Sequence, residues 1–231
     1  MIDKRFGALG RRDQNPRPAV AVLYVEDDYS MLSPLRVIFR FANGSLLAAL
    51  LAVVTMSATP AAAASHKKVY LLRGLTNVLS PGIDRLNEEL QQRNIDVTIA
   101  NHMFADSLVN EAIEGCRSGR ISSIVLVGHS LGASAAVSMA EQFQRAGLHV
   151  ALIVTMDPVT KIVVPNNVHM LRNYYLSSGV GTVVARGGQF RGKLENVDMG
   201  KSDYGHVSLT NAPVVQNQAM HDILAANSRC K

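Results

Sequence analysis

The chain has 231 residues, of which 48% are hydrophobic and 18% charged, a composition too apolar for an intrinsically disordered protein. The formal net charge of +5 comes from basic residues scattered along the sequence, whereas a nucleic-acid-binding protein concentrates them on one face, so we expect no nucleic-acid partner. Two cysteines are too few for a disulfide-framework mini-protein, and because they lie in no Cys-x-x-Cys or Cys/His cluster we expect no zinc or redox site.

An export segment is the first feature along the chain. Arg36 and Arg40 precede an uncharged apolar stretch of eleven residues at 46–56, and small residues follow at 59–65 as TPAAAAS. A basic flank, a short apolar stretch and an Ala-x-Ala site are typical of a secretory signal peptide. Because eleven residues fall short of the ~20 that span a bilayer, we expect 31–64 to be a signal peptide and the protein to be secreted or periplasmic. The alternative is an uncleaved anchor, which would give the protein its only membrane contact.

The sequence thus divides into three parts. Residues 1–30 are expected to be a non-structural extension, 31–64 the export segment and 65–231 one compact domain. Export would place the domain where disulfides persist. Cys116 and Cys230 are then either a disulfide or two unrelated thiols, and the sequence leaves this open because it does not give their Cα separation.

Strand-like and helix-like segments alternate through the domain. Continuous apolar runs predict strands at 67–72, 95–100, 121–127 and 149–156, with later strands at 168–176 and 181–185. Apolar stripes at helical spacing and an Ala-rich segment predict helices starting at 80–81 and spanning 106–117, 131–146 and 214–226. Buried strands that alternate with helices are typical of a parallel sheet covered on both faces. We therefore expect an α/β fold, a three-layer α/β/α sandwich with a mostly parallel sheet, which binds ligands beyond the carboxyl ends of its strands.

The predicted third strand ends in a motif that carries chemistry. It reads Gly128-His129-Ser130-Leu131-Gly132, and a helix follows at once. G-x-S-x-G between a strand and a helix is a tight turn that strains the serine backbone, while the glycines let strand and helix approach each other. The turn raises the Ser130 hydroxyl above the sheet edge and directs the Leu131 N–H toward a reacting carbonyl. The motif predicts Ser130 as a nucleophile, and a turn serving only geometry is the alternative.

A histidine must take the proton of the serine, because a hydroxyl alone is a weak nucleophile. In this fold the order along the chain is Ser, acid, His. His206 lies in the loop SDYGHVSLT before the last predicted helix, from which it can approach Ser130, and is the predicted base. His149 and His169 begin predicted strands at the opposite edge, and His221 lies within a helix at a position suited to solvent.

An acid must orient the imidazole and stabilise its cation. Asp157 directly follows the predicted fourth strand, and we favour it because strand ends fix geometry better than loops do. Asp198 and Asp203 are alternatives that lie closer to His206 in sequence.

A second oxyanion donor is expected from the loop after the first strand. That loop reads LLRGLTNVLSPG, and the backbone N–H of Leu75 is the candidate. The N–H groups of Gly74 and Thr76 are the alternatives.

The segments GHSLGASAAVSMA and VALIVTMDPV resemble the nucleophile elbow and the acid-bearing strand of α/β-hydrolases, and the stretch from GHSLGA to DPV is similar to pancreatic-type lipases and related esterases. The resemblance implies a serine hydrolase that acts on esters or thioesters through an acyl-enzyme, and together with the predicted export segment it leads us to expect an exported serine hydrolase that cleaves carboxylic esters. Ser130, His206 and Asp157 would form its triad, and no cofactor would be needed. The implied partner is a small ester, thioester or lipid. A thioesterase or lipid-processing enzyme with the same triad, and a non-catalytic binding protein on the same scaffold, are the alternatives.

The chain also departs from that family. It lacks the first two strands and any long cap, and RGL stands where many lipases have a His-Gly pattern. An uncapped site should be open. The Gly-rich segment 177–193 is expected either to fold over the site as a lid or to complete a hairpin.

Overall fold

The computed structural model of the chain describes residues 66–75 and 79–231. The predicted extension at 1–30, the predicted export segment at 31–64 and the candidate donor Thr76 lie outside the described residues. Within the described part, no helix is long and apolar enough to cross a membrane.

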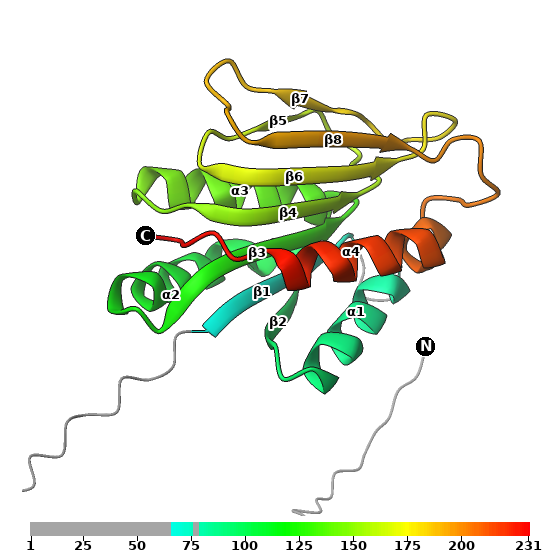
Figure 1. Cartoon of the computed structure of the whole chain (residues 1–231). Helices are drawn as coiled ribbons and strands as arrows, with labels where there is room; N and C mark the ends of the chain where they lie inside the picture. Colours follow the sequence, from blue (N-terminus) through cyan, green and yellow to red (C-terminus); the bar gives the residue numbers. More distant parts are fainter. Residues whose placement is uncertain (1–65, 76–78) are drawn as a thin grey trace, which may run out of the picture. The chain divides into compact units, whose positions relative to one another are not determined.

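Six parallel strands form the main sheet in the order β2-β1-β3-β4-β6-β8 (Figure 1). Their bounds are β1 His66–Arg73, β2 Asp96–Asn101, β3 Ile121–His129, β4 Val150–Met156, β6 Val168–Tyr175 and β8 Lys193–Asp198. A second, two-stranded parallel sheet pairs β5 (Ile162–Val164) with β7 (Val184–Arg186). Because all pairings of the main sheet are parallel, its carboxyl ends lie along one edge.

Helices cover both faces of the main sheet (Figure 1). The helices are α1 Pro81–Gln92, α2 Ala105–Ser118, α3 Leu131–Arg145 and α4 Pro213–Ala225, with short 3₁₀ turns η1 His102–Phe104 and η2 Ser208–Asn211. One apolar core joins α1 and α4 to the sheet, and the other joins α2 and α3 to its opposite face. The fold is therefore the predicted three-layer α/β/α sandwich with a parallel sheet.

Helix α1 shows how the sequence places an element. Pro81 occupies the first turn, where its missing N–H costs no hydrogen bond. Ile83, Leu86 and Leu90 follow at helical spacing and are fully buried. Helix α2 ends at Gly119, whose φ of 79° is a left-handed conformation that glycine adopts without strain.

The sequence did not predict β5 and β8, and the expectation for the segment 177–193 differs from the structure. Strand β8 completes the main sheet beside β6, yet it was not expected because Lys193, Glu195 and Asn196 make it polar. Within the segment 177–193, β7 pairs with β5 in parallel, so the expectation of a hairpin is wrong. The start of this segment instead packs on the loop after β4, where the Thr182 N–H donates to the Pro158 carbonyl at 2.9 Å.

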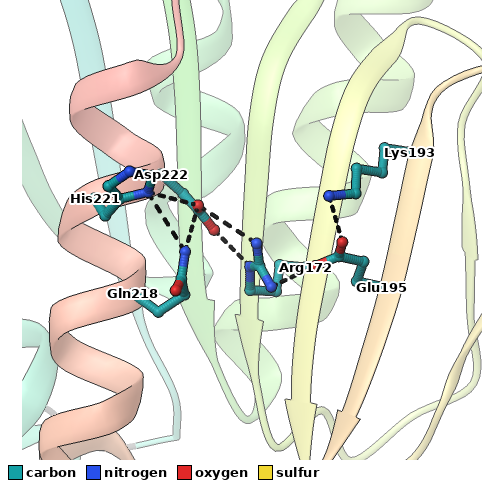
Figure 2. Close-up of polar contacts among 6 residues, drawn as sticks. All are labelled: Arg172, Lys193, Glu195, Gln218, His221 and Asp222. Carbon is teal, nitrogen blue, oxygen red and sulfur yellow. Dashed lines mark hydrogen bonds and ion pairs between the residues drawn. The ribbon is translucent and has the colours of Figure 1, made fainter.

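A polar network fastens α4 to the sheet beyond the apolar core (Figure 2). Arg172 on β6 donates from Nε to Asp222 Oδ2 of α4 at 2.5 Å, and both side chains are nearly buried, with 14% and 7% exposed. Arg172 also pairs with Glu195 on β8, its neighbour across the sheet, and Glu195 pairs in turn with the exposed Lys193.

Cys116 and Cys230 form a disulfide, with Cα atoms 6.1 Å apart. The bond joins the end of α2 to the C-terminal tail. Hydrogen bonds hold the same tail to the sheet, from the Cys230 N–H to the Ser122 carbonyl and from the His149 N–H to the Cys230 carbonyl, both 2.9 Å. Of the two states that the sequence left open, the structure contains the bonded one.

Candidate active site

Ser130 lies in the sharp turn between β3 and α3. Its φ of 58° and ψ of −122° are a conformation that side-chain-bearing residues rarely adopt, so the turn holds local strain. The Ser130 N–H donates to the Met156 carbonyl of β4 at 3.0 Å, which anchors the turn to the neighbouring strand. A Cβ on Gly128 would overlap the backbone of Gly132, and one on Gly132 would overlap the Leu72 carbonyl. The flanking glycines are therefore required by close packing.

Asp157 is fully buried at the carboxyl end of β4. Its φ of 48° is also positive, and its N–H donates to the Tyr174 carbonyl at 2.7 Å. Asp157 Oδ1 accepts the Leu176 N–H at 2.8 Å, and a Cβ on Gly181 would overlap this oxygen. One carboxylate oxygen is thus fixed by the backbone, which leaves Oδ2 to face the site.

His206 approaches this free oxygen from the loop before η2. Its Nδ1 lies 2.6 Å from Asp157 Oδ2, and its side chain is partly exposed. With Nδ1–H donating to the carboxylate, Nε2 carries the lone pair that can accept a proton. Among the described contacts there is no hydrogen bond from the Ser130 hydroxyl to His206. The two residues nevertheless share one edge of the sheet, since the ring of His129, next to Ser130, lies with its centroid 4.7 Å from that of His206.

The two alternative acids make different contacts. Asp198 Oδ1 accepts the Gly200 N–H at 2.8 Å and the Ser177 N–H at 3.2 Å, and these bonds lower the pKa of this exposed carboxyl. Asp203 is exposed. Of the three candidates, Asp157 is the one that contacts the His206 ring.

Gly74 packs directly against the turn that contains Ser130. A Cβ added to Gly74 would lie 2.9 Å from Ser130 Cβ, so the backbone at the end of β1 passes close to the serine. The Gly74 N–H donates to Ser80 Oγ at 3.3 Å, which removes it from the candidate oxyanion donors. The N–H of Leu75 stays a candidate from this loop, as does that of Thr76, which lies outside the described residues. The N–H of Leu131, the other expected donor, is at the start of α3.

Two buried polar residues, Ser80 and His129, were not predicted as part of the site. His129 Nδ1 lies 2.8 Å from Ser80 Oγ, and His129 Nε2 lies 3.0 Å from the backbone carbonyl oxygen of His206. Burial, together with the nearby His206, lowers the pKa of His129 to about 4. The position of His129 inside the G-x-S-x-G motif was the available signal, but its partners come from loops that a sequence does not place.

The three other histidines considered as the base, His149, His169 and His221, lie away from this edge. His149 and His169 line a cavity of about 290 Å³ at the amino ends of β4 and β6, together with Arg191 and Arg229. His221 is exposed on α4. Within residues 66–75 and 79–231, no group of three or more His, Cys, Asp or Glu side chains is placed to hold a metal ion.

Solved structures include distant likenesses to this chain. No family model and no curated protein matches the chain. A crystal structure from Xanthomonas campestris pv. campestris, described as a "putative hydrolase of the alpha/beta superfamily", is 13% identical with a TM-score of 0.39. The match covers 68% of this chain and 98% of that one. A likeness at this identity and TM-score does not assign a function to this chain.

Proposed function

We propose that the protein is a serine hydrolase that cleaves carboxylic esters, with Ser130 as nucleophile, His206 as base and Asp157 as orienting acid. The observation that carries the proposal is the 2.6 Å contact from His206 Nδ1 to a fully buried Asp157 carboxylate. It occurs at the carboxyl edge of the sheet, beside a serine in a strained strand-to-helix turn.

The proposed reaction begins when Ser130 Oγ attacks the ester carbonyl carbon and its proton passes to His206 Nε2. The tetrahedral oxyanion would accept the N–H groups of Leu131 and Leu75. Collapse of this intermediate breaks the ester C–O bond, and His206 returns the proton to the departing alkoxide, which leaves as an alcohol. Water then attacks the acyl-enzyme by the same route and releases the acid. The Ser–His hydrogen bond would form on substrate binding, since such bonds are often long in free enzymes.

Asp157 is suited to its role by its surroundings. The Leu176 N–H fixes Oδ1, so Oδ2 can hold the imidazole in one orientation. Because the carboxylate is buried, its attraction for the imidazolium formed during the reaction is screened less than it would be in water.

Exposed apolar side chains near the serine favour an apolar acyl group. Met103 and Phe104 follow β2 and are 71% and 60% exposed, and Leu75 follows β1 and is 67% exposed. His102 Nδ1 contacts the Gly74 carbonyl at 2.9 Å, which places the turn after β2 against the backbone that passes close to Ser130 at the end of β1. An ester or thioester of an apolar acid would gain contact with these side chains.

We propose that the enzyme acts after export, in the periplasm or outside the cell. The disulfide between Cys116 and Cys230 supports this, because such bonds persist in oxidising compartments. N-terminal sequencing of the mature protein tests it. A chain beginning just after residue 62 or 64 is expected, and an intact Met1 would contradict cleavage.

Turnover of p-nitrophenyl acetate and butyrate tests the activity. Ser130→Ala should lower kcat by at least ~10³-fold. Equal rates for the two proteins would show that Ser130 does not catalyse hydrolysis of these esters, and no turnover by the wild type would favour a binding protein. Matched butyryl esters and thioesters would separate an esterase from a thioesterase.

A pair of matched substitutions tests the acid. Asp157→Asn should lower kcat by at least ~10³-fold, because the amide no longer holds the productive tautomer of His206. Asp203→Asn makes the same chemical change on an exposed residue. It should leave kcat within roughly twofold of the wild type, because substitutions at the surface usually have small effects. An unimpaired Asp157→Asn enzyme would overturn the assignment.

A further inference from the structure

The ring of His129 lies at the meeting point of three segments that surround the candidate active site. It is 1% exposed and is the last residue of β3, directly before Ser130. Its two nitrogens contact Ser80, at the start of α1, and the backbone of His206. Neither partner is close to His129 in sequence, since 49 and 77 positions separate them from it.

The direction of each hydrogen bond follows from the chemistry of the partners. A carbonyl oxygen only accepts, so the proton of His129 lies on Nε2 and is donated to His206. His129 Nδ1 is then an acceptor, and the Ser80 hydroxyl donates to it. The Ser80 oxygen keeps a lone pair for the Gly74 N–H, 3.3 Å away. One directed chain therefore runs from Gly74 through Ser80 and His129 to His206.

Protonation of His129 would reverse part of this chain. A second ring proton on Nδ1 would donate to the Ser80 oxygen, so the Ser80 hydroxyl would lose its acceptor. It would also place a positive charge beside the ring of His206, 4.7 Å away between centroids. Burial keeps the pKa of His129 near 4, well below neutral pH, so the ring stays uncharged where an enzyme of this kind would work.

We propose that His129 is a positioning residue that fixes the base His206 relative to Ser130, an inference that rests on the proposed function. Asp157 holds the His206 ring, and His129 holds the His206 backbone. Because His129 ends β3 directly before Ser130, the loop carrying the base is tied directly to the element carrying the nucleophile. Through Ser80 the same residue is also linked to the N–H of Gly74, the neighbour of the candidate oxyanion donor Leu75.

Two substitutions of His129 separate positioning from packing. His129→Gln retains an N–H that can reach the His206 carbonyl, whereas His129→Phe retains the ring shape and neither hydrogen bond. His221→Phe makes the same change on an exposed ring of α4 and serves as control. With p-nitrophenyl butyrate, we expect His129→Phe to lower kcat by about 30-fold with KM within about threefold, because small displacements of a base cost up to 10²-fold. His129→Gln should recover about tenfold of that loss, and His221→Phe should match the wild type. Equal kcat values for His129→Phe and His129→Gln would overturn the proposal.

Nuclear magnetic resonance of ¹⁵N-histidine-labelled protein gives a second measurement that does not depend on turnover. His129 is expected in the neutral Nε2–H tautomer. The His206 Nδ1–H proton, bonded to Asp157, should be sharp in the wild type and in His129→Gln but broadened in His129→Phe. An unchanged signal in His129→Phe would refute positioning even if the wild type were inactive. An inactive wild type in which the signal does respond would refute only the proposed ester hydrolysis.

Discussion

Reduction of the disulfide between Cys116 and Cys230 should strongly destabilise the domain. The bond closes a loop of 114 positions. The chain-entropy relation for such a loop gives about 4.8 kcal/mol at 25 °C, because the cross-link restricts the unfolded chain. For a domain of this size that corresponds to a fall in Tm on the order of 10–20 °C.

Urea unfolding of the oxidised and reduced wild type measures the effect. Both cysteines are buried, so reduction has to be carried out in the unfolded chain before refolding. The free energy of unfolding should fall by about 3–5 kcal/mol. The double variant Cys116→Ala/Cys230→Ala should show no further response to reductant, which controls for effects of the reductant itself.

The contacts of the C-terminal tail allow the oxidised and reduced proteins to be compared in the same folded state. Its hydrogen bonds to Ser122 and His149 involve only backbone atoms and do not require the sulfur bond, so the reduced chain can still form the folded state. A difference below about 1 kcal/mol between the oxidised and reduced proteins would refute the loop-entropy reasoning.

Three further changes have defined outcomes. Asp222→Asn removes the more buried of the two carboxylates that pair with the nearly buried Arg172 and should lower the free energy of unfolding by about 3 kcal/mol in urea titrations. Lys193→Met, at an exposed ion pair, should change it by less than about 1 kcal/mol. The pKa of His129 is lowered in the folded protein, so its contribution to stability is full above pH 6.5, its ordinary pKa, and is lost as the pH falls to about 4. The difference in free energy of unfolding is on the order of 3 kcal/mol. Urea unfolding at pH 7 and 4.5 should reveal it in the wild type and not in His129→Phe. Gly128→Ala would overlap the start of α3 and should cost about 3 kcal/mol and most of the esterase activity, while Gly188→Ala, with open space around it, should be neutral in both assays.

The sequence predicted the sheet wherever burial dictated the pattern. Strands β3 and β4 lie in the middle of the sheet, and their apolar runs at 121–127 and 149–156 are read without ambiguity. Strand β8 lies at an edge, where only one neighbour pairs with it and polar side chains are tolerated, so periodicity gave no signal. Strand β5 has three residues, too few for any periodic pattern, and was not predicted, whereas the strand predicted at 181–185 overlaps β7 at two residues.

The candidate site divides in the same way. Ser130 and Asp157 follow strands directly, so the end of each strand predicts their place at the edge of the sheet. His206 could be chosen only by excluding other histidines, because its loop has no pattern that fixes its path. The partnership of Ser80 with His129 depends on how two loops meet in space, and no spacing in the chain encodes it.

The chain turns to opposite faces of the sheet after two neighbouring parallel strands, β1 and β3. After β1 it turns to α1 on one face of the sheet, and after β3 it turns to α3 on the other. In doubly wound sheets, ligands bind at the strand ends where the chain diverges in this way. Leu75 follows β1 at this divergence, and its exposed side chain is not one of the proposed proton-transfer or positioning groups. Directed evolution at this one position could therefore retune the proposed acyl preference while leaving the Ser80–His129 contact and the candidate triad unchanged.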